Sequence, residues 1–86
     1  MGLYSGQFSE VFSRLLEKAD VSCYEISRNT HLDQAYLSRL KSGEKDNPSP
    51  ETVMKISLAL YRCGSKITLY DIEKLFNSIG HSMRFQ

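Results

Sequence analysis

Glycine and proline residues divide this chain of 86 residues into short segments, and within each segment the apolar residues recur at a spacing of three or four positions. This spacing is typical of amphipathic helices, whereas half-buried strands alternate apolar and polar residues. The dividing residues are Gly2, Gly6, Gly43, Pro48, Pro50, Gly64 and Gly80. The sequence therefore predicts an all-α fold of five short helices.

Each of the last four predicted helices has a start signal. The residues predicted to cap them are Ser22, Asp33, Ser49 and Thr68. Glu25 and Asp71 stand three residues after a cap, which is the position that completes a capping box. Pro50 suits the first position of the fourth helix, and Gly43 suits the end of the third.

Apolar stripes mark the first, fourth and fifth helices. The first stripe, over residues 8–19, consists of Phe8, Val11, Phe12, Leu15 and Leu16, and Asp20 ends that helix. The fourth helix carries Val53, Ile56 and Leu60, and the fifth carries Leu69, Ile72, Leu75, Phe76 and Ile79. The remaining tail, residues 81–86, alternates apolar and polar residues, so it is predicted either as a short strand or as a frayed end.

Composition restricts the possible functions. Hydrophobic residues make up 41% and charged residues 24%, which is ordinary for one globular domain over residues 1–86. The chain contains no apolar run near the ~18 residues of a membrane span and does not begin with a basic and then apolar leader, so we expect a cytoplasmic protein.

Residues that carry chemistry are not clustered in the sequence. Cys23 and Cys63 are forty positions apart, and His31 and His81 have no neighbours at metal-ligand spacing. We therefore expect free thiols, no metal and no cofactor. Paired carboxylates, a nucleophile with its base and a phosphate loop are also not found, so we expect no enzyme activity.

The stretch "SCYEISRNTHLDQAYLSRLKSGEKDNPSPETVMKISLAL", from Ser22 to Leu60, resembles the phage-repressor type of helix-turn-helix, the Cro-like or xenobiotic-response-element (XRE) regulators. The features that agree in phase are a capped short helix, a turn, a second short helix with Tyr-Leu-Ser-Arg-Leu, a closing glycine and "NPSPET". The resemblance implies a five-helix, lambda-repressor-like domain with the helix-turn-helix at residues 22–42. It also implies a DNA-binding transcriptional regulator, most often a repressor.

Two departures from the family pattern concern the backbone. The glycine usual in the turn is His31 here, and the glycine usual ahead of the second helix is Asp20. If these positions need φ > 0, His and Asp are among the non-glycine residues that tolerate it. A third departure replaces an Arg–Glu pair of the family with Leu16 and Lys41, which leaves Lys41 free for a phosphate.

The third helix, residues 34–42, is the one that the resemblance places in the major groove. A helical projection puts Leu37 and Leu40 on one face and mostly small residues on the opposite face. By resemblance, the residues that read base edges are Gln34, Ala35, Ser38 and Arg39. Glutamine can pair with adenine and alanine can touch a thymine methyl, while Arg39 can grip guanine or a phosphate.

Phosphate contacts are expected around this helix. Ser22 and the amides that begin the second helix suit an anion, and Cys23 replaces a glutamine that contacts the DNA backbone in relatives. Tyr36 can either donate to a phosphate or pack beside Leu40. Lys41 and Lys45 complete a small positive rim.

The formal net charge is only +1, so one subunit should make few phosphate contacts and should need a second. We expect a homodimer on a palindromic site in double-stranded DNA, formed through the segment 68–86. The predicted interface residues are Leu69, Ile72, Phe76 and Ile79, with Met83 and Phe85 as an extension if the tail is a strand. The alternative is an antitoxin that binds a toxin partner and represses its own promoter.

Overall fold

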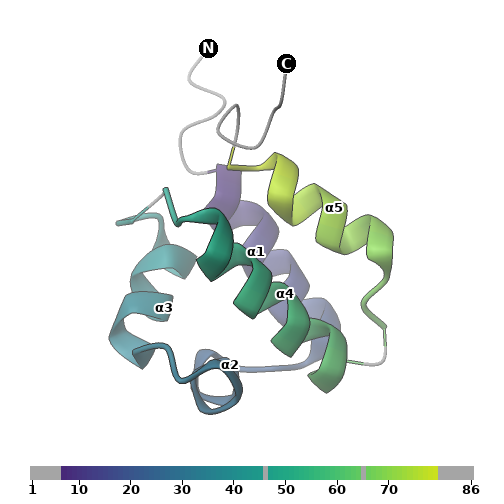
Figure 1. Ribbon diagram of the computed structural model, residues 1–86, viewed down its shortest axis with the longest axis horizontal. Coiled ribbons are helices and arrows are strands. Elements are labelled where there is room, and N and C mark those ends of the chain that lie inside the picture. Colours follow the sequence, from purple (N-terminus) through teal and green to yellow (C-terminus); the bar gives the residue numbers. More distant parts are fainter. Residues whose placement is uncertain (1–6, 46, 65, 80–86) are drawn as a thin grey trace.

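The computed structural model describes residues 7–45, 47–64 and 66–79, and this part of the chain forms five α-helices (Figure 1). They are α1 (Gln7–Ala19), α2 (Cys23–Thr30), α3 (Gln34–Ser42), α4 (Pro50–Cys63) and α5 (Leu69–Asn77). The predicted all-α fold is confirmed. The possible strand of the tail, with Met83 and Phe85, lies outside the described residues.

The predicted caps account for where these helices begin. The side chains of all four cap residues accept a hydrogen bond from the backbone N–H three residues later. Both predicted capping boxes are complete, because Glu25 and Asp71 accept in return from the backbone of Ser22 and Thr68. Each box satisfies two N–H groups that a helix start would otherwise leave unpaired.

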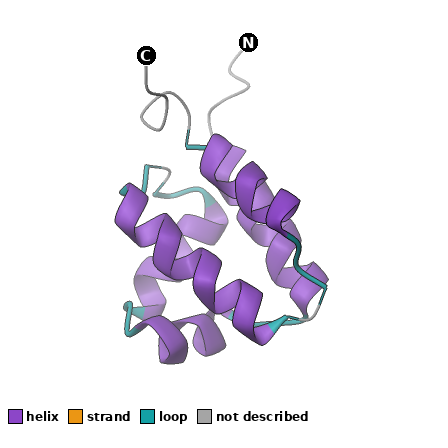
Figure 2. Cartoon of the chain, turned by 45° about the vertical axis from the view of Figure 1, so that its right-hand side comes forward, coloured by secondary structure: helices purple, strands orange, loops and turns teal. Residues whose placement is uncertain are grey.

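Helix α1 runs through the middle of the domain and packs against α3, α4 and α5, while α2 packs against α3 and α4 (Figures 1 and 2). The rings of Phe8 and Phe12 on α1 are 5.6 Å apart between centroids. The largest fully buried side chains are Phe8, Phe12, Ile26, Leu37, Leu40, Val53, Ile56, Leu60 and Leu75. Helices α3 and α5 therefore share one core but lie on opposite sides of α1 and α4 (Figure 1).

Gly64, directly after α4, marks a close approach of two helix ends. A Cβ atom at this position would lie 2.4 Å from the Cβ of Ala19 at the end of α1. Real Cβ atoms do not come this close, so any larger residue at position 64 would push the two ends apart. The glycine thus allows the α4–α5 connection to pass beside α1.

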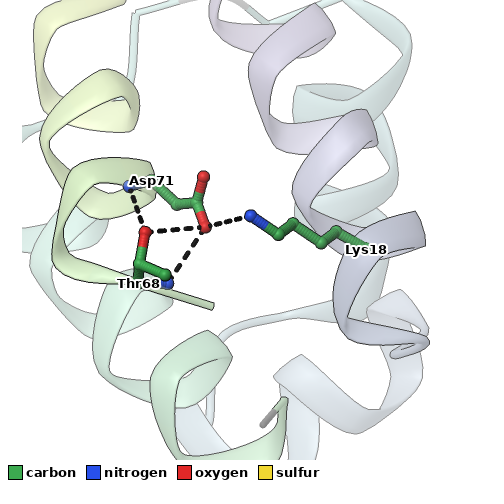
Figure 3. A network of polar contacts seen from close by, with 3 residues as sticks. All are labelled: Lys18, Thr68 and Asp71. Carbon is green, nitrogen blue, oxygen red and sulfur yellow. Dashed lines mark hydrogen bonds and ion pairs between the residues drawn. The ribbon is translucent and has the colours of Figure 1, made fainter. Parts of the chain in front are cut away.

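The start of α5 is held to α1 by a buried carboxylate (Figure 3). One oxygen of Asp71, Oδ2, accepts from Lys18 Nζ at 2.7 Å and from the backbone N–H and hydroxyl of Thr68 at 3.0 and 3.1 Å. Burial alone raises the pKa of Asp71, but the hydrogen bonds from Lys18 and Thr68, with the lysine charge, bring its pKa below the ordinary value. This network fixes the position of α5.

Candidate nucleic-acid interface

The turn between α2 and α3 is held by side-chain hydroxyls. Ser27 donates to the carbonyl of Leu32 at 2.7 Å. Thr30 donates to the carbonyl of Ile26 at 2.7 Å and accepts from the backbone N–H of Leu32 at 3.1 Å. These bonds satisfy backbone groups where the chain leaves α2, and they fix the orientation of α3 relative to α2.

The two positions at which the family usually has glycine have positive φ here. Asp20 has φ 60° and His31 has φ 65°, and they are the non-glycine residues with positive φ in the described part of the chain. His31 is the residue that ends α2, and its N–H donates to the carbonyl of Ser27 at 2.8 Å. The turn therefore keeps the glycine geometry with a side chain present, at some conformational cost.

Helix α3 has a buried face and a solvent face. Leu37 and Leu40 are fully buried, and Leu32 just before the helix is partly buried against the core. The helix begins at Asp33, whose carboxylate accepts from the N–H of Tyr36, and ends at Gly43 with φ 93°. Its exposed side chains are Gln34, Ala35, Ser38, Arg39, Lys41 and Ser42. All four residues predicted to read bases are thus on the solvent face, and most of this face is small.

Cys23, at the start of α2, is buried rather than offered to solvent. Ser38 and Lys41 of α3 lie near its thiol, so α3 covers the start of α2 at this point. Burial raises the pKa of this thiol even though Lys41 and Ser38 act in the opposite direction. The sequence predicted a phosphate contact by Cys23, and the buried position of its thiol does not support that contact.

The start of α2 is nevertheless suited to an anion through its backbone. Ser22 is exposed, and its hydroxyl accepts the N–H of Glu25 at 3.2 Å while its own hydrogen can still be donated. The N–H groups of Cys23 and Tyr24 belong to the first turn, which has no carbonyl partners within the helix. These groups could contact a phosphate oxygen.

Three exposed cations surround the solvent face of α3. In the described residues, ion pairs join Lys18 with Asp71 and Lys55 with Glu51, and none involves Arg39, Lys41 or Lys45. The backbone of Lys41 is anchored to α1, because its carbonyl accepts from the hydroxyl of Ser13 at 3.3 Å. The cationic ends are therefore free for phosphates, while the backbone that carries Lys41 is held in place.

Tyr36 is half-buried and packs against the core, as one of the two predicted alternatives required. It lines a shallow recess beside the start of the α3–α4 loop, together with Leu40, Glu44, Lys45 and Asn47. Asn47 is exposed, precedes the buried Pro48 and lines the same recess as Lys45. Sequence reasoning did not single out Asn47. An amide placed between a lysine and an anchoring proline is the signal that could have found it.

Together these features define a DNA-binding helix-turn-helix domain. A short helix whose exposed face carries mostly small residues together with unpaired cations suits a major groove. No group of three or more potential metal ligands occurs within the described ranges. None of the five described helices is long and apolar enough to cross a membrane.

Comparison with known protein families assigns the chain to one of them. The model of the helix-turn-helix family HTH_3, which is of the XRE type, matches residues 13–60. This match covers more than half of the chain, and the protein therefore belongs to this family of DNA-binding regulators, whose members are generally not enzymes. A search of curated proteins and a search of solved structures gave no match.

Proposed function

We propose that this protein is a cytoplasmic transcriptional repressor that binds a palindromic operator as a homodimer and inserts α3 into the major groove. The observation that carries this proposal is the solvent face of α3, where Gln34, Ala35, Ser38 and Arg39 are all exposed beside unpaired cations. Two such helices on adjacent half-sites would be separated by ~34 Å, one turn of DNA.

Base readout is assigned to the start and middle of α3. Gln34 and Ala35 come first and would meet an adenine edge and a thymine methyl. Ser38 and Arg39 follow one turn later, and Arg39 would pair with guanine or a phosphate.

Phosphate contacts are assigned to groups on both sides of this helix. Ser22 and the backbone N–H of Cys23 would hold one phosphate at the start of α2. Lys41 and Lys45 would hold others, and Tyr36 would offer its hydroxyl at the edge of the same surface. Asn47 is assigned to this second group because it lines the same recess as Lys45.

Dimerisation follows from the small charge of one subunit. With three unpaired cations near α3, one copy would make few phosphate contacts and would bind weakly. Leu69 is 74% exposed and therefore available to a second copy, and Ile72 and Phe76 are partly exposed. Ile79 is only 8% exposed and packs in the core, so its placement does not support the interface role predicted for it.

Selection of binding sites from random duplex DNA tests the proposal. We expect a palindromic consensus, and Arg39→Ala should weaken binding to it and relax preference at one position of each half-site. Lys66→Ala removes an exposed cation from the loop before α5 and serves as the control. An Arg39→Ala protein with unchanged affinity and preference would refute the assignment of α3. Recovery of a non-palindromic site would refute the proposed dimer geometry.

A further inference from the structure

Helix α4 exposes three large apolar side chains to solvent. Met54, Leu58 and Tyr61 are 55%, 58% and 54% exposed. They follow one another at intervals of four and three residues, so they lie on one side of the helix and form a continuous line, here called the α4 ridge. With roughly 200 Å² for each large side chain, the ridge leaves on the order of 300 Å² exposed. Apolar patches of this size on a soluble protein are often functional.

A shallow groove runs beside the ridge, where α2 packs against α4. The residues that line it are Asn29, Thr30, Lys55, Leu58, Ala59 and Arg62. Leu58 belongs to both features, so the ridge forms one edge of the groove. None of these lining residues comes from α3, and none is assigned to DNA. The groove and the ridge are therefore a surface separate from the candidate nucleic-acid interface.

The charged side chains of the groove are both cationic. Lys55 and Arg62 are exposed and stand two helical turns apart on α4, with Leu58 between them. No carboxylate is among the described residues that line the groove. Lys55 has Glu51 as a neighbour at 3.8 Å, but both side chains are exposed, so this pair is weak. Arg62 takes part in neither of the two ion pairs of the described residues. The groove thus offers a positive charge on each side of an apolar side chain.

The neutral polar groups of the groove are already used within the protein. The amide nitrogen of Asn29 donates to the carbonyl of Glu25 at 2.9 Å and to the thiol of Cys63 at 3.3 Å, which occupies both of its hydrogens. The hydroxyl of Thr30 is engaged in the turn that leads to α3. The two cations are therefore the donors that remain for a ligand, and they select negative charge.

This combination favours a segment of another protein over other occupants. A second copy would bring an equally positive groove, and like charges repel across an interface. Helices that bind anionic membranes carry a polar face rich in lysine and arginine, whereas α4 has two cations and the nearby Glu51. The DNA backbone has no apolar group to cover the ridge. An amphipathic helix with anchors at intervals of three and four residues fits both the ridge and the cations.

We propose that the α4 ridge and its groove are a docking site for an acidic amphipathic helix of another protein. Apolar side chains of that helix cover Leu58 and the ridge, and its carboxylates meet Lys55 and Arg62. The inference goes beyond the proposed function and does not depend on it, because it uses no residue assigned to DNA. Partner and operator can therefore be bound at the same time.

Selection from a displayed library of random peptides, each long enough for several helical turns, tests the chemistry of the occupant. The full chain is the bait, and peptides that also bind the Leu58→Glu variant are discarded. We expect the remaining peptides to be rich in Asp and Glu, with apolar residues at helical spacing. Recovery of neutral or basic peptides, or of none that depend on Leu58, would overturn the proposal.

Fluorescence anisotropy with the synthetic consensus peptide of that selection tests the cations. Arg62→Glu should weaken binding about tenfold, because it reverses the charge that meets a carboxylate. The same variant should regain affinity for a peptide whose acidic residues are replaced by lysine. Lys66→Glu is the matched control, since Lys66 is an exposed cation outside the groove. Circular dichroism checks that the variants keep the helical content of the wild type. An equal loss in Lys66→Glu would mean general charge attraction and no docking site.

Competition experiments separate this occupant from the others. Excess consensus peptide should leave the oligomeric state of the full chain unchanged in sedimentation equilibrium, and a duplex of random sequence should not displace the peptide. Dissociation of oligomers by the peptide would assign the ridge to a second copy. Displacement of the peptide by that duplex, or by vesicles of phosphatidylglycerol, would assign it to DNA or to a membrane, and each of these results would overturn the proposal. Arg39→Ala should bind the peptide like the wild type, so failure of the proposed function can be told from failure of the docking site.

Discussion

Nζ of Lys18 lies 2.7 Å from Oδ2 of Asp71, and this contact joins the end of α1 to the first turn of α5 across 53 positions of sequence. The carboxylate is buried, whereas the lysine side chain is 42% exposed. A buried carboxylate with several donors contributes to stability only while it is ionised.

Asp71 should therefore make stability depend on pH in the acid range. Its pKa is lowered in the folded state, so its contribution is complete above the ordinary value of 3.8 and is lost as pH falls through the lowered pKa. At neutral pH we expect Asp71→Ala to lose about 1–3 kcal/mol of unfolding free energy, because the acceptor for Thr68 in the capping box and the partner of Lys18 disappear together. Urea titrations at a series of pH values measure this, with the exposed Glu73→Gln as control. A loss that does not shrink as the pH falls well below the ordinary pKa of 3.8 would contradict the explanation.

Replacement of His31 by glycine should stabilise the protein. The left-handed conformation costs a non-glycine residue roughly 1–2 kcal/mol, and the greater freedom of glycine in the unfolded chain offsets part of the gain, so we expect about 0.5 kcal/mol. Arg28→Gly, three residues earlier in the interior of α2, should instead lose about 1 kcal/mol. Thermal unfolding of the two variants compares them directly, and a loss in both would mean that the side chain of His31 has a stabilising contact.

The hydroxyl of Thr30 should contribute more to stability than the shape of the side chain does. Thr30→Val removes the two hydrogen bonds that the Thr30 hydroxyl makes in the turn, so we expect a loss of about 1–2 kcal/mol. Thr30→Ser keeps the hydroxyl and should retain most of the stability. The turn fixes the orientation of α3 relative to α2. Under conditions in which both variants are folded, the valine variant should therefore bind operator DNA more weakly than the serine variant. Equal stability of the two variants would contradict this role of the hydroxyl.

Lys41 and Lys45 should act on affinity without changing sequence preference. A plot of log K against log salt concentration has a negative slope, and each phosphate contact that is lost makes this slope less steep by about 0.9. We expect Lys41→Ala and Lys45→Ala each to show this effect per subunit, and Lys66→Ala to show none. Binding titrations from low to moderate salt provide the slopes, and a changed consensus sequence in either variant would indicate a base contact instead.

The two thiols should differ in reactivity. Cys63 is exposed, although it accepts a hydrogen bond from Asn29 at 3.3 Å, whereas Cys23 is buried with a raised pKa. Since the thiolate is the reactive form, Cys63 should be labelled first and Cys23 only on unfolding. Mass spectrometry after brief labelling at neutral pH distinguishes the two sites. Rapid labelling of Cys23 would mean that the contact between α2 and α3 opens readily.

The features that could be predicted from the sequence are those that depend on residues close together in the chain. The caps at Ser22 and Thr68 depend on residues three positions apart, so the sequence pattern shows them directly. The positive φ at His31 was suggested only by the resemblance, because the family usually has glycine at this position. The Lys18–Asp71 pair joins two distant segments, and only the packing of α5 on α1 brings them together. Burial of Cys23 and Ile79 likewise depends on which helix covers which face. The solvent face of α3, by contrast, follows from the spacing of residues within one helix and was predictable.

The small charge of one subunit bears on how such a regulator would respond inside a cell, because one copy alone would hold DNA weakly. If most of the protein is monomeric at low abundance, the amount of dimer rises with the square of the total concentration. Occupancy of an operator would then change sharply over a narrow range of expression. The three unpaired cations near α3 in each subunit would thus help to set the gene dosage at which repression begins.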